Sequence, residues 1–387
     1  MVIGTQRLRL SVATAALTAG LVAGLVGGAS PALAAAGGSW AWGDNALGQL
    51  GNGTLVAHRA AASTLAPALA DLAAGREHVL GLTPAGTVVA WGWNGTGQLG
   101  DGTRVNRTRP VVVAGLPAAA AIGAGHYHSL AVDTAGRVWT WGRNTDGQLG
   151  DGTTTNRSRP VQVAGVSTAV AVAGGREHSL ALLADGTVLA WGANTDGQLG
   201  TGDLRARLQP AAVPGLTGVV RIAAGRGSSV ALRADGTVFA WGDNQYGQVG
   251  DGTTTDRPSP TRVSGLPPIT AIATFGFHCL ALDASGRVWA WGLGAQGQVG
   301  GGVFRQVNRV PAAVPGLTGV VAVGAGRNHS VAVDAAGRVW AWGNNDLGQL
   351  GDGTTTNRAS PVLAATLPGV RRVAAGRDYS IALAPTG

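Results

Sequence analysis

The chain has 387 residues, of which 65 are glycine and 45% are hydrophobic, so it is neither a disordered linker nor a chain too short to bury a core. All 28 basic residues are arginine; they exceed the 20 acidic residues and are dispersed rather than clustered. Dispersed arginine favours a solvated surface over a nucleic-acid-binding stripe, so we expect no nucleic-acid partner.

Residues 1–34 have the order of a secretory signal peptide. Arg7 and Arg9 precede an apolar run over residues 10–26, and small residues flank the leucine of Ala32-Leu33-Ala34. We expect cleavage after Ala34 or Ala36 and export of a soluble protein without membrane attachment. A membrane anchor is the alternative, although an anchor usually needs about 20 strongly apolar residues and carries no such cleavage site.

Residues 35–387 consist of one motif repeated seven times. Trp-Gly pairs recur at intervals of 49, 50, 50, 50, 50 and 51 residues, and Gly-Gln-Leu-Gly or Gly-Gln-Val-Gly follows each pair. The tryptophans are Trp42, Trp91, Trp141, Trp191, Trp241, Trp291 and Trp342, and the glutamines are Gln49, Gln98, Gln148, Gln198, Gln248, Gln298 and Gln349. A fixed period of this size indicates units that bury their apolar faces against one another. We place the repeats at residues 38–86, 87–136, 137–186, 187–236, 237–286, 287–337 and 338–387.

The unit at residues 137–186 contains four strand patterns. Residues 137–141 alternate in polarity, residues 161–163 follow a proline, and residues 169–173 and 179–183 are small and apolar. Four short antiparallel strands per unit predict an all-β fold, a seven-bladed β-propeller with one blade from each unit. Because blades taper inward, we expect the strands rich in Ala, Gly and Val near the axis and the tryptophan strand further out.

The two ends of the chain are in register with each other. Six repeats end at a glycine, the chain itself ends at Gly387, and Gly38 stands at the first position of a repeat. We therefore expect the N-terminal strand at residues 39–42 to complete a blade with a C-terminal strand at residues 379–383. This join would close the ring, remove the exposed sheet edges of an open array, and favour a monomer.

Three sequence patterns follow one another within residues 124–152 and again within residues 325–353. They are Ala-Gly-x-x-His-Ser-x-Ala-Val, Gly-Arg-Val-Trp-x-Trp-Gly and Gly-Gln-Leu-Gly-Asp-Gly-Thr. In these patterns the chain resembles the regulator of chromosome condensation repeat family over residues 38–387, whereas a period near fifty alone would also suit kelch propellers. The resemblance implies the fold but no single function, because propellers have many functions.

Members of that family suggest three functions. They include a nuclear guanine-nucleotide exchange factor on chromatin, a plant ultraviolet-B photoreceptor and a secreted bacterial inhibitor of β-lactamases. The secretory leader disfavours the first, and the third remains an alternative, although that inhibitor typically lacks the long Gly-Asp-Gly-Thr loop. The photoreceptor uses tryptophans just after the Ala-Gly as its chromophore, and that chromophore is absent here. At this position the chain carries Arg76, His126, Arg176, Arg226, Gly276, Arg327 and Arg377.

The repeated polar residues favour a structural role over catalysis. Five histidines share one repeat position: His78, His128, His178, His278 and His329. Equivalent positions in a ring are spread around its axis, so we expect hydrogen bonds between blades rather than a metal site. We expect the Trp-Gly indoles to be bonded locally in the core, and the glutamines to tie the adjacent loop to a backbone group.

No arrangement typical of an enzyme or a cofactor site occurs in the sequence. The only glutamates, Glu77 and Glu177, lie two repeats apart, which is a poor arrangement for paired-carboxylate hydrolysis. Each Asp-Gly-Thr loop holds too few carboxylates for the roughly six to eight oxygen ligands of calcium. A single cysteine, Cys279, cannot form an internal disulfide, and we expect it to be buried. The sequence therefore predicts no enzymatic activity and no cofactor.

The positions that vary among the repeats define a candidate binding surface. Between the Ala-Gly and the histidine each repeat carries two variable residues, many of them arginine or aromatic, as is typical of protein interfaces. The loops at residues 51–59, 201–208 and 301–309 also depart from the common form. The candidate residues are Arg76, Glu77, His126, Tyr127, Arg176, Glu177, Phe275, Phe277, Phe304, Arg327 and Arg377.

The sequence thus predicts a secreted scaffold that binds another protein. Inhibition of a secreted enzyme such as a β-lactamase is one alternative, and binding of a cell wall or glycan is another.

Overall fold

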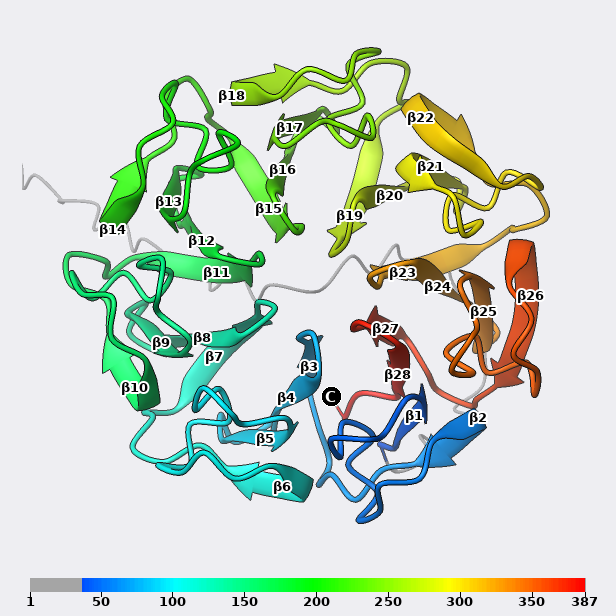
Figure 1. The fold of residues 1–387 in the computed structure, drawn as a ribbon, viewed down its shortest axis with the longest axis horizontal. Helices are drawn as coiled ribbons and strands as arrows, with labels where there is room; N and C mark the ends of the chain where they lie inside the picture. Colours follow the sequence, from blue (N-terminus) through cyan, green and yellow to red (C-terminus); the bar gives the residue numbers. More distant parts are fainter. Residues whose placement is uncertain (1–36, 387) are drawn as a thin grey trace, which may run out of the picture.

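Short apolar runs separated by glycine turns fold residues 37–386 into strands alone. The computed structural model describes residues 37–386, which form seven four-stranded antiparallel sheets arranged as the blades of a propeller (Figure 1). The predicted signal peptide lies outside the described residues. Within those residues, no helix is long and apolar enough to cross a membrane.

Six blades are continuous in sequence, and we number them in chain order. Blade 1 holds β3 (Asp71–Ala74), β4 (His78–Leu82), β5 (Val88–Gly92) and β6 (Arg107–Val112). Blade 2 holds β7 (Ala119–Ala124), β8 (His128–Asp133), β9 (Val138–Gly142) and β10 (Arg157–Gln162). Blade 3 holds β11 (Ala169–Gly174), β12 (His178–Leu183), β13 (Val188–Gly192) and β14 (Arg207–Ala212).

The next three blades repeat this order. Blade 4 holds β15 (Val219–Ala224), β16 (Ser228–Arg233), β17 (Val238–Gly242) and β18 (Arg257–Arg262). Blade 5 holds β19 (Ile269–Thr274), β20 (His278–Asp283), β21 (Val288–Gly294) and β22 (Arg305–Ala313). Blade 6 holds β23 (Val320–Ala325), β24 (His329–Asp334), β25 (Arg338–Gly343) and β26 (Arg358–Thr366).

Blade 7 joins the two ends of the chain, as the register predicted. It holds β27 (Arg372–Ala375) and β28 (Tyr379–Leu383) from the C-terminal end, with β1 (Ser39–Gly43) and β2 (His58–Ser63) from the N-terminal end. Strands β1 and β28 pair antiparallel, with Ser39 opposite Leu383 and Trp42 opposite Ser380. The chain therefore closes the ring through hydrogen bonds within one sheet.

The small-residue strands lie innermost and the tryptophan strands third from the axis, as predicted (Figure 1). The expectation of one blade per repeat unit was wrong by half a unit. Residues 137–186 give β9 and β10 to blade 2 but β11 and β12 to blade 3. The turn at residues 184–187 joins two strands of the same blade, and the chain crosses between blades at residues 163–168 instead. The predicted short strand at residues 161–163 is longer, Arg157–Gln162, with a register shift between Arg157 and Val161.

The repeated tryptophan, glutamine, serine and histidine join neighbouring blades. Nε1 of Trp141 donates to the backbone oxygen of Gln98 in the preceding blade at 2.8 Å, and Oγ of Ser129 donates to the same oxygen at 2.7 Å. Nε2 of His128 lies 2.8 Å from Oγ of Ser179 in the following blade. The predicted inter-blade role of the histidines is confirmed, whereas the expectation of a local indole bond was wrong, because the indole reaches the neighbouring blade.

The Gln98 side chain and Cys279 behave as predicted. Oε1 of Gln98 accepts a bond from the backbone N–H of Thr96 at 3.1 Å, which ties down the adjacent loop. Cys279 is buried, with its thiol 3.5 Å from the backbone oxygen of Gln248.

Candidate protein-binding face

The variable residues gather on one face of the propeller, here called the upper face. It is formed by the turns between the first and second strands of each blade, which surround the axis, and by the loops between the third and fourth strands. The inner turns are linked around the axis. His126 N–H donates to the oxygen of Gly175 at 2.9 Å, and Arg377 N–H donates to the oxygen of Arg76 at 2.9 Å. A surface built on bonded turns is pre-organised for binding, which lowers the entropy lost on association.

A second ring of variable residues, which was not predicted from the sequence, lies beside the first. Each member directly follows a Trp-Gly pair and bonds through its N–H to a variable residue of the inner turn. Arg143 N–H donates to the oxygen of Tyr127 at 2.9 Å, for example. The second ring is Asp44, Trp93, Arg143, Ala193, Asp243, Leu293 and Asn344. Its signal in the sequence is variation immediately next to an otherwise repeated pair.

Tyr127 lies at the centre of a cluster of cationic and aromatic groups drawn from both rings. Cζ of Arg76 lies 5.1 Å from the centroid of its ring, and Cζ of Arg143 lies 5.3 Å from it. The Trp93 ring meets the Tyr127 ring edge-on at 5.7 Å. Arginine, tyrosine and tryptophan are the side chains that most often dominate binding energy in protein interfaces.

His126 and Phe275 are buried against each other rather than displayed. Their rings stack at 4.4 Å with an angle of 22° between planes, and Nε2 of His126 lies 3.2 Å from the backbone oxygen of Phe275. The two residues come from blades 2 and 5, so the pair joins opposite sides of the ring near the axis. Burial lowers the pKa of His126 to about 3, so its imidazole is neutral at pH 7.

Phe275 needs a rearranged turn, because all six other inner turns have glycine at this position. A Cβ on Gly125 would lie 2.2 Å from Cε1 of His128, so a side chain is excluded there. Gly125 N–H also donates to the oxygen of His128 at 2.9 Å. In the Phe275 turn the hydroxyl of Thr274 donates to the oxygen of His278 at 2.9 Å instead. The departure from the Ala-Gly pattern thus serves packing at the axis.

The remaining candidate residues are less closely grouped. Arg377 pairs with Glu77 at 2.8 Å and Arg176 with Glu177 at 3.3 Å. Arg327 donates its backbone N–H to Gly376 at 3.0 Å. The Phe277 ring meets Tyr246 at 5.1 Å, and Cζ of Arg226 lies 4.8 Å from its centroid. Phe304 is 58% exposed in the loop before β22.

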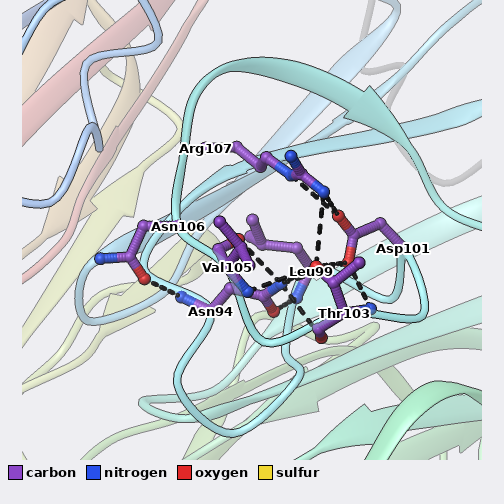
Figure 2. Close-up of polar contacts among 7 residues, drawn as sticks. All are labelled: Asn94, Leu99, Asp101, Thr103, Val105, Asn106 and Arg107. Carbon is purple, nitrogen blue, oxygen red and sulfur yellow. Dashed lines mark hydrogen bonds and ion pairs between the residues drawn. The ribbon is translucent and has the colours of Figure 1, made fainter.

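One buried asparagine holds each of the common outer loops in place (Figure 2). Oδ1 of Asn94 accepts a bond from the N–H of Leu99 at 2.9 Å, and its Nδ2 donates to the backbone oxygens of Val105 and Thr103 at 3.1 and 3.2 Å. Asn106 closes the loop by accepting a bond from the N–H of Asn94 at 2.9 Å. The side chain thereby replaces the hydrogen bonds that a longer strand pair would supply.

The Asp-Gly-Thr carboxylates are engaged within their own loops. Oδ1 of Asp101 accepts bonds from the N–H and hydroxyl of Thr103 at 2.9 and 2.7 Å, and Oδ2 accepts a bond from Nη2 of Arg107 at 2.7 Å (Figure 2). Burial acts to raise the pKa of Asp101, but these bonds outweigh it and hold the pKa below its usual value. Among residues 37–386, no three metal-ligating side chains converge on one point.

Comparison with protein families identifies the repeats. A model described as the RCC1-like domain matches residues 22–275, well over half of the chain. The chain belongs to the RCC1-like family. The remaining part of this RCC1-like chain matches regulator of chromosome condensation (RCC1) repeats at residues 285–333 and 336–383.

Curated relatives match the RCC1-like chain over short stretches. Human E3 ubiquitin-protein ligase HERC2 is 46% identical over 78 residues, which are 19% of this chain and 2% of HERC2. The RCC2 homolog of Xenopus laevis is 40% identical over 77 residues, which are 18% of this chain and 15% of that protein. The chain thus spans only a small part of the length of the curated relatives it matches.

Solved structures match almost the whole RCC1-like propeller. Prp20p of Saccharomyces cerevisiae, described with its binding to Gsp1p and histones, superimposes with a TM-score of 0.80 at 26% identity, covering 91% of this chain and 92% of that one. Human WBSCR16 superimposes with a TM-score of 0.82 at 25% identity, covering 91% and 100%.

Proposed function

We propose that this protein is an exported scaffold that binds another protein through the upper face of its propeller. The observation that carries the proposal is the cluster around Tyr127, in which Arg76, Arg143 and Trp93 contact one aromatic ring. These side chains are partly exposed, and backbone hydrogen bonds hold the turns that carry them. They therefore offer contact area to a partner at a low cost in conformational entropy. Export is inferred from the order of charged, apolar and small residues in residues 1–34.

The similar structures agree with a protein partner. Prp20p binds Gsp1p and histones, and it shares the seven-bladed fold over nine tenths of both chains. A propeller of this family therefore offers a surface suited to protein recognition, and the partner follows from the side chains on that surface.

Affinity capture from extracellular protein tests the proposal. The Tyr127→Ala variant should bind a captured partner with a dissociation constant at least about tenfold higher. The reason is that truncation of a hot-spot side chain costs about 2 kcal/mol or more of binding free energy. Leu363→Ala, an exposed residue 47% accessible on the outer strand β26, is the matched control and should retain the partner. Equal capture by both variants would show that the upper face is not the binding surface.

The two alternatives give different results in direct assays. Inhibition of a β-lactamase by the purified protein at micromolar concentration would identify an enzyme inhibitor. The protein could instead be retained on cell-wall or glycan supports. Equal retention of the unaltered protein and Tyr127→Ala would favour glycan binding and contradict the proposed surface.

A further inference from the structure

A polar pocket opens on the upper face where blades 3, 4 and 5 meet. Its volume is about 290 Å³. The inner turns of the three blades and the outer loops of blades 3 and 4 supply its walls. Its ionisable residues are Arg176, Glu177, Asp196, Arg226, Asp243 and Asp256.

The pocket exists because Gly227 has no side chain. The other six turns carry Glu77, Tyr127, Glu177, Phe277, Asn328 and Asp378 at this position. A Cβ on Gly227 would lie 3.2 Å from Oδ2 of Asp196 and 3.2 Å from Cβ of Asp243. The φ angle of Gly227 is not positive, so its backbone conformation does not itself require glycine. Its effect is to leave space in front of two carboxylates.

Negative charge is in excess around this space. Glu177 pairs with Arg176 at 3.3 Å, whereas Asp196, Asp243 and Asp256 form no ion pair with any residue of the described chain. Asp243 is 8% exposed. Burial, and then the carboxylate of Asp256, raise the pKa of Asp196 above its usual value. A bound cation would relieve this repulsion.

The amide of a largely buried side chain faces the same space. Gln198 is 3% exposed and lines the pocket, and its Oε1 accepts a bond from the N–H of Asp196 at 3.0 Å. Its Nε2 donates to no group within residues 37–386. In blade 7 the equivalent nitrogen of Gln49 donates to Asp44 at 2.8 Å, whereas those of Gln98, Gln148, Gln248 and Gln298 are enclosed without a partner. The Gln198 nitrogen differs from those four because its side chain lines a pocket, so it can donate to a ligand that brings a hydrogen-bond acceptor.

The dimensions and chemistry fit an extended cation. The carboxylates come from two loops rather than meeting at one point, and Phe277 adds an apolar wall. An arginine side chain combines an apolar stem with a planar guanidinium that has five donors, and the peptide that carries it brings carbonyl acceptors.

We propose that this pocket binds an arginine side chain of the protein partner, with the guanidinium beside Asp196 and Asp243 and a peptide carbonyl accepting from Gln198. The inference rests on the proposed protein-binding function and specifies the chemistry of the partner.

Titration of the protein with Nα-acetyl-arginine methylamide, followed by backbone amide chemical shifts, tests the pocket. Saturable shifts are expected at Gly227 and Phe277. Nα-acetyl-citrulline methylamide has the same shape without the charge and should bind at least about tenfold more weakly. Equal binding of the two probes, or no saturable shift with the arginine probe, would overturn the proposal.

Two variants locate the effect. Asp196→Asn with Asp243→Asn should weaken arginine binding at least about tenfold, whereas Asp185→Asn with Asp235→Asn, the same charge change on exposed turns of the opposite face, should not. Gly227→Tyr keeps the charges but should block the pocket. If both Asp196→Asn/Asp243→Asn and Gly227→Tyr bind as the unaltered protein does while their melting temperatures are unchanged, the pocket is not the site.

The Tyr127→Ala variant separates this inference from the proposed function. It should bind the arginine probe normally while losing the partner. A partner that depends on Tyr127 but not on Asp196 and Asp243 would support the function and contradict the arginine pocket.

Discussion

A pair formed by a histidine and a serine joins most neighbouring blades. Where the histidine is replaced, the serine that would face it is replaced as well. His78 faces Ser129 at 3.0 Å, and four further His–Ser pairs repeat this contact around the ring. Where serine replaces the histidine, at Ser228, the facing serine is replaced by Cys279. The space above Gly225 is then shared by Ser228 and Thr274, whose hydroxyls each lie 2.9 Å from where a Cβ would stand. The two positions of the pair therefore change together at this boundary between blades.

The buried histidines make stability depend on acidity. Burial lowers the pKa of His128 to about 3 and that of His178 to about 4, below the usual 6.5. Above pH 6.5 both folded and unfolded chains hold these groups neutral. As pH falls below 6.5 the unfolded chain takes up protons first, so the free energy of unfolding should drop by up to about 1.4 kcal/mol per pH unit for each such histidine.

Urea denaturation at pH 7 and pH 5 measures this effect. The midpoint should fall clearly at pH 5, and His178→Gln should show a smaller fall because one proton-binding site is removed from the unfolded chain. A midpoint that is the same at both pH values would contradict the prediction.

The outer loops show how one side chain decides the form of an element. Asn144 is fully buried, and its Oδ1 accepts a bond from the N–H of Leu149 at 2.9 Å, as Asn94 does for its own loop. Blade 5 has Gly294 at this position. There the strands lengthen to Val288–Gly294 and Arg305–Ala313, and Nδ2 of Asn308 donates to the oxygen of Gly292 at 3.2 Å. Without the asparagine, the chain satisfies its backbone by extending the hairpin.

Removing one loop asparagine should therefore be costly. Asn144→Ala leaves buried backbone groups unpaired, and we expect a loss of about 2–4 kcal/mol in the free energy of unfolding. Hydrogen exchange should increase across residues 145–156. Thr145→Ala, an exposed change in the same loop, is the control and should stay within about 0.5 kcal/mol. Equal stability of the two variants would show that the asparagine does not organise the loop.

At the scale of the whole molecule, the position of the chain ends explains how the ring is closed. The C-terminal end supplies the two inner strands of blade 7, and the N-terminal end supplies the two outer strands. The ends thus meet between the second and third strands of blade 7. At the equivalent place in blade 3, the turn at residues 184–187 joins β12 to β13. Neither terminal pair can leave without breaking a four-stranded sheet, which couples the ends to the cooperative unit.

Circular permutation tests this account of closure. A permutant that begins at Thr187, ends at Asp185 and links residue 386 to residue 37 recreates the same two-plus-two closure in blade 3. It should melt within a few degrees of the natural chain order. A permutant opened at Gly165, between blades 2 and 3, has no shared blade and should melt at least about 5 °C lower. Equal melting temperatures would show that the shared blade does not stabilise the ring.

Much of this protein is determined by its sequence alone. Strand patterns, turns and a period of fifty residues are local or regularly repeated, so they predict the strands, the number of blades and the joining of the N-terminal strand to the strand at residues 379–383 in one blade. The variable inner turns were also evident. Trp93 and Asp243 were not predicted from the sequence. A variable residue is interpreted as ordinary surface variation until the backbone hydrogen bond that places it beside a turn is known.

The tertiary structure alone decided which variable residues are accessible and where a recess opens. His126 and Phe275 are 149 positions apart, and only the closed ring brings them into contact. The indole of Trp141 reaches Gln98 rather than a local partner because the blades, not the repeats, pack face to face. The pocket beside Gly227 depends on side chains from three blades. Each of these contacts is set by the radius and order of the ring, which no single repeat encodes.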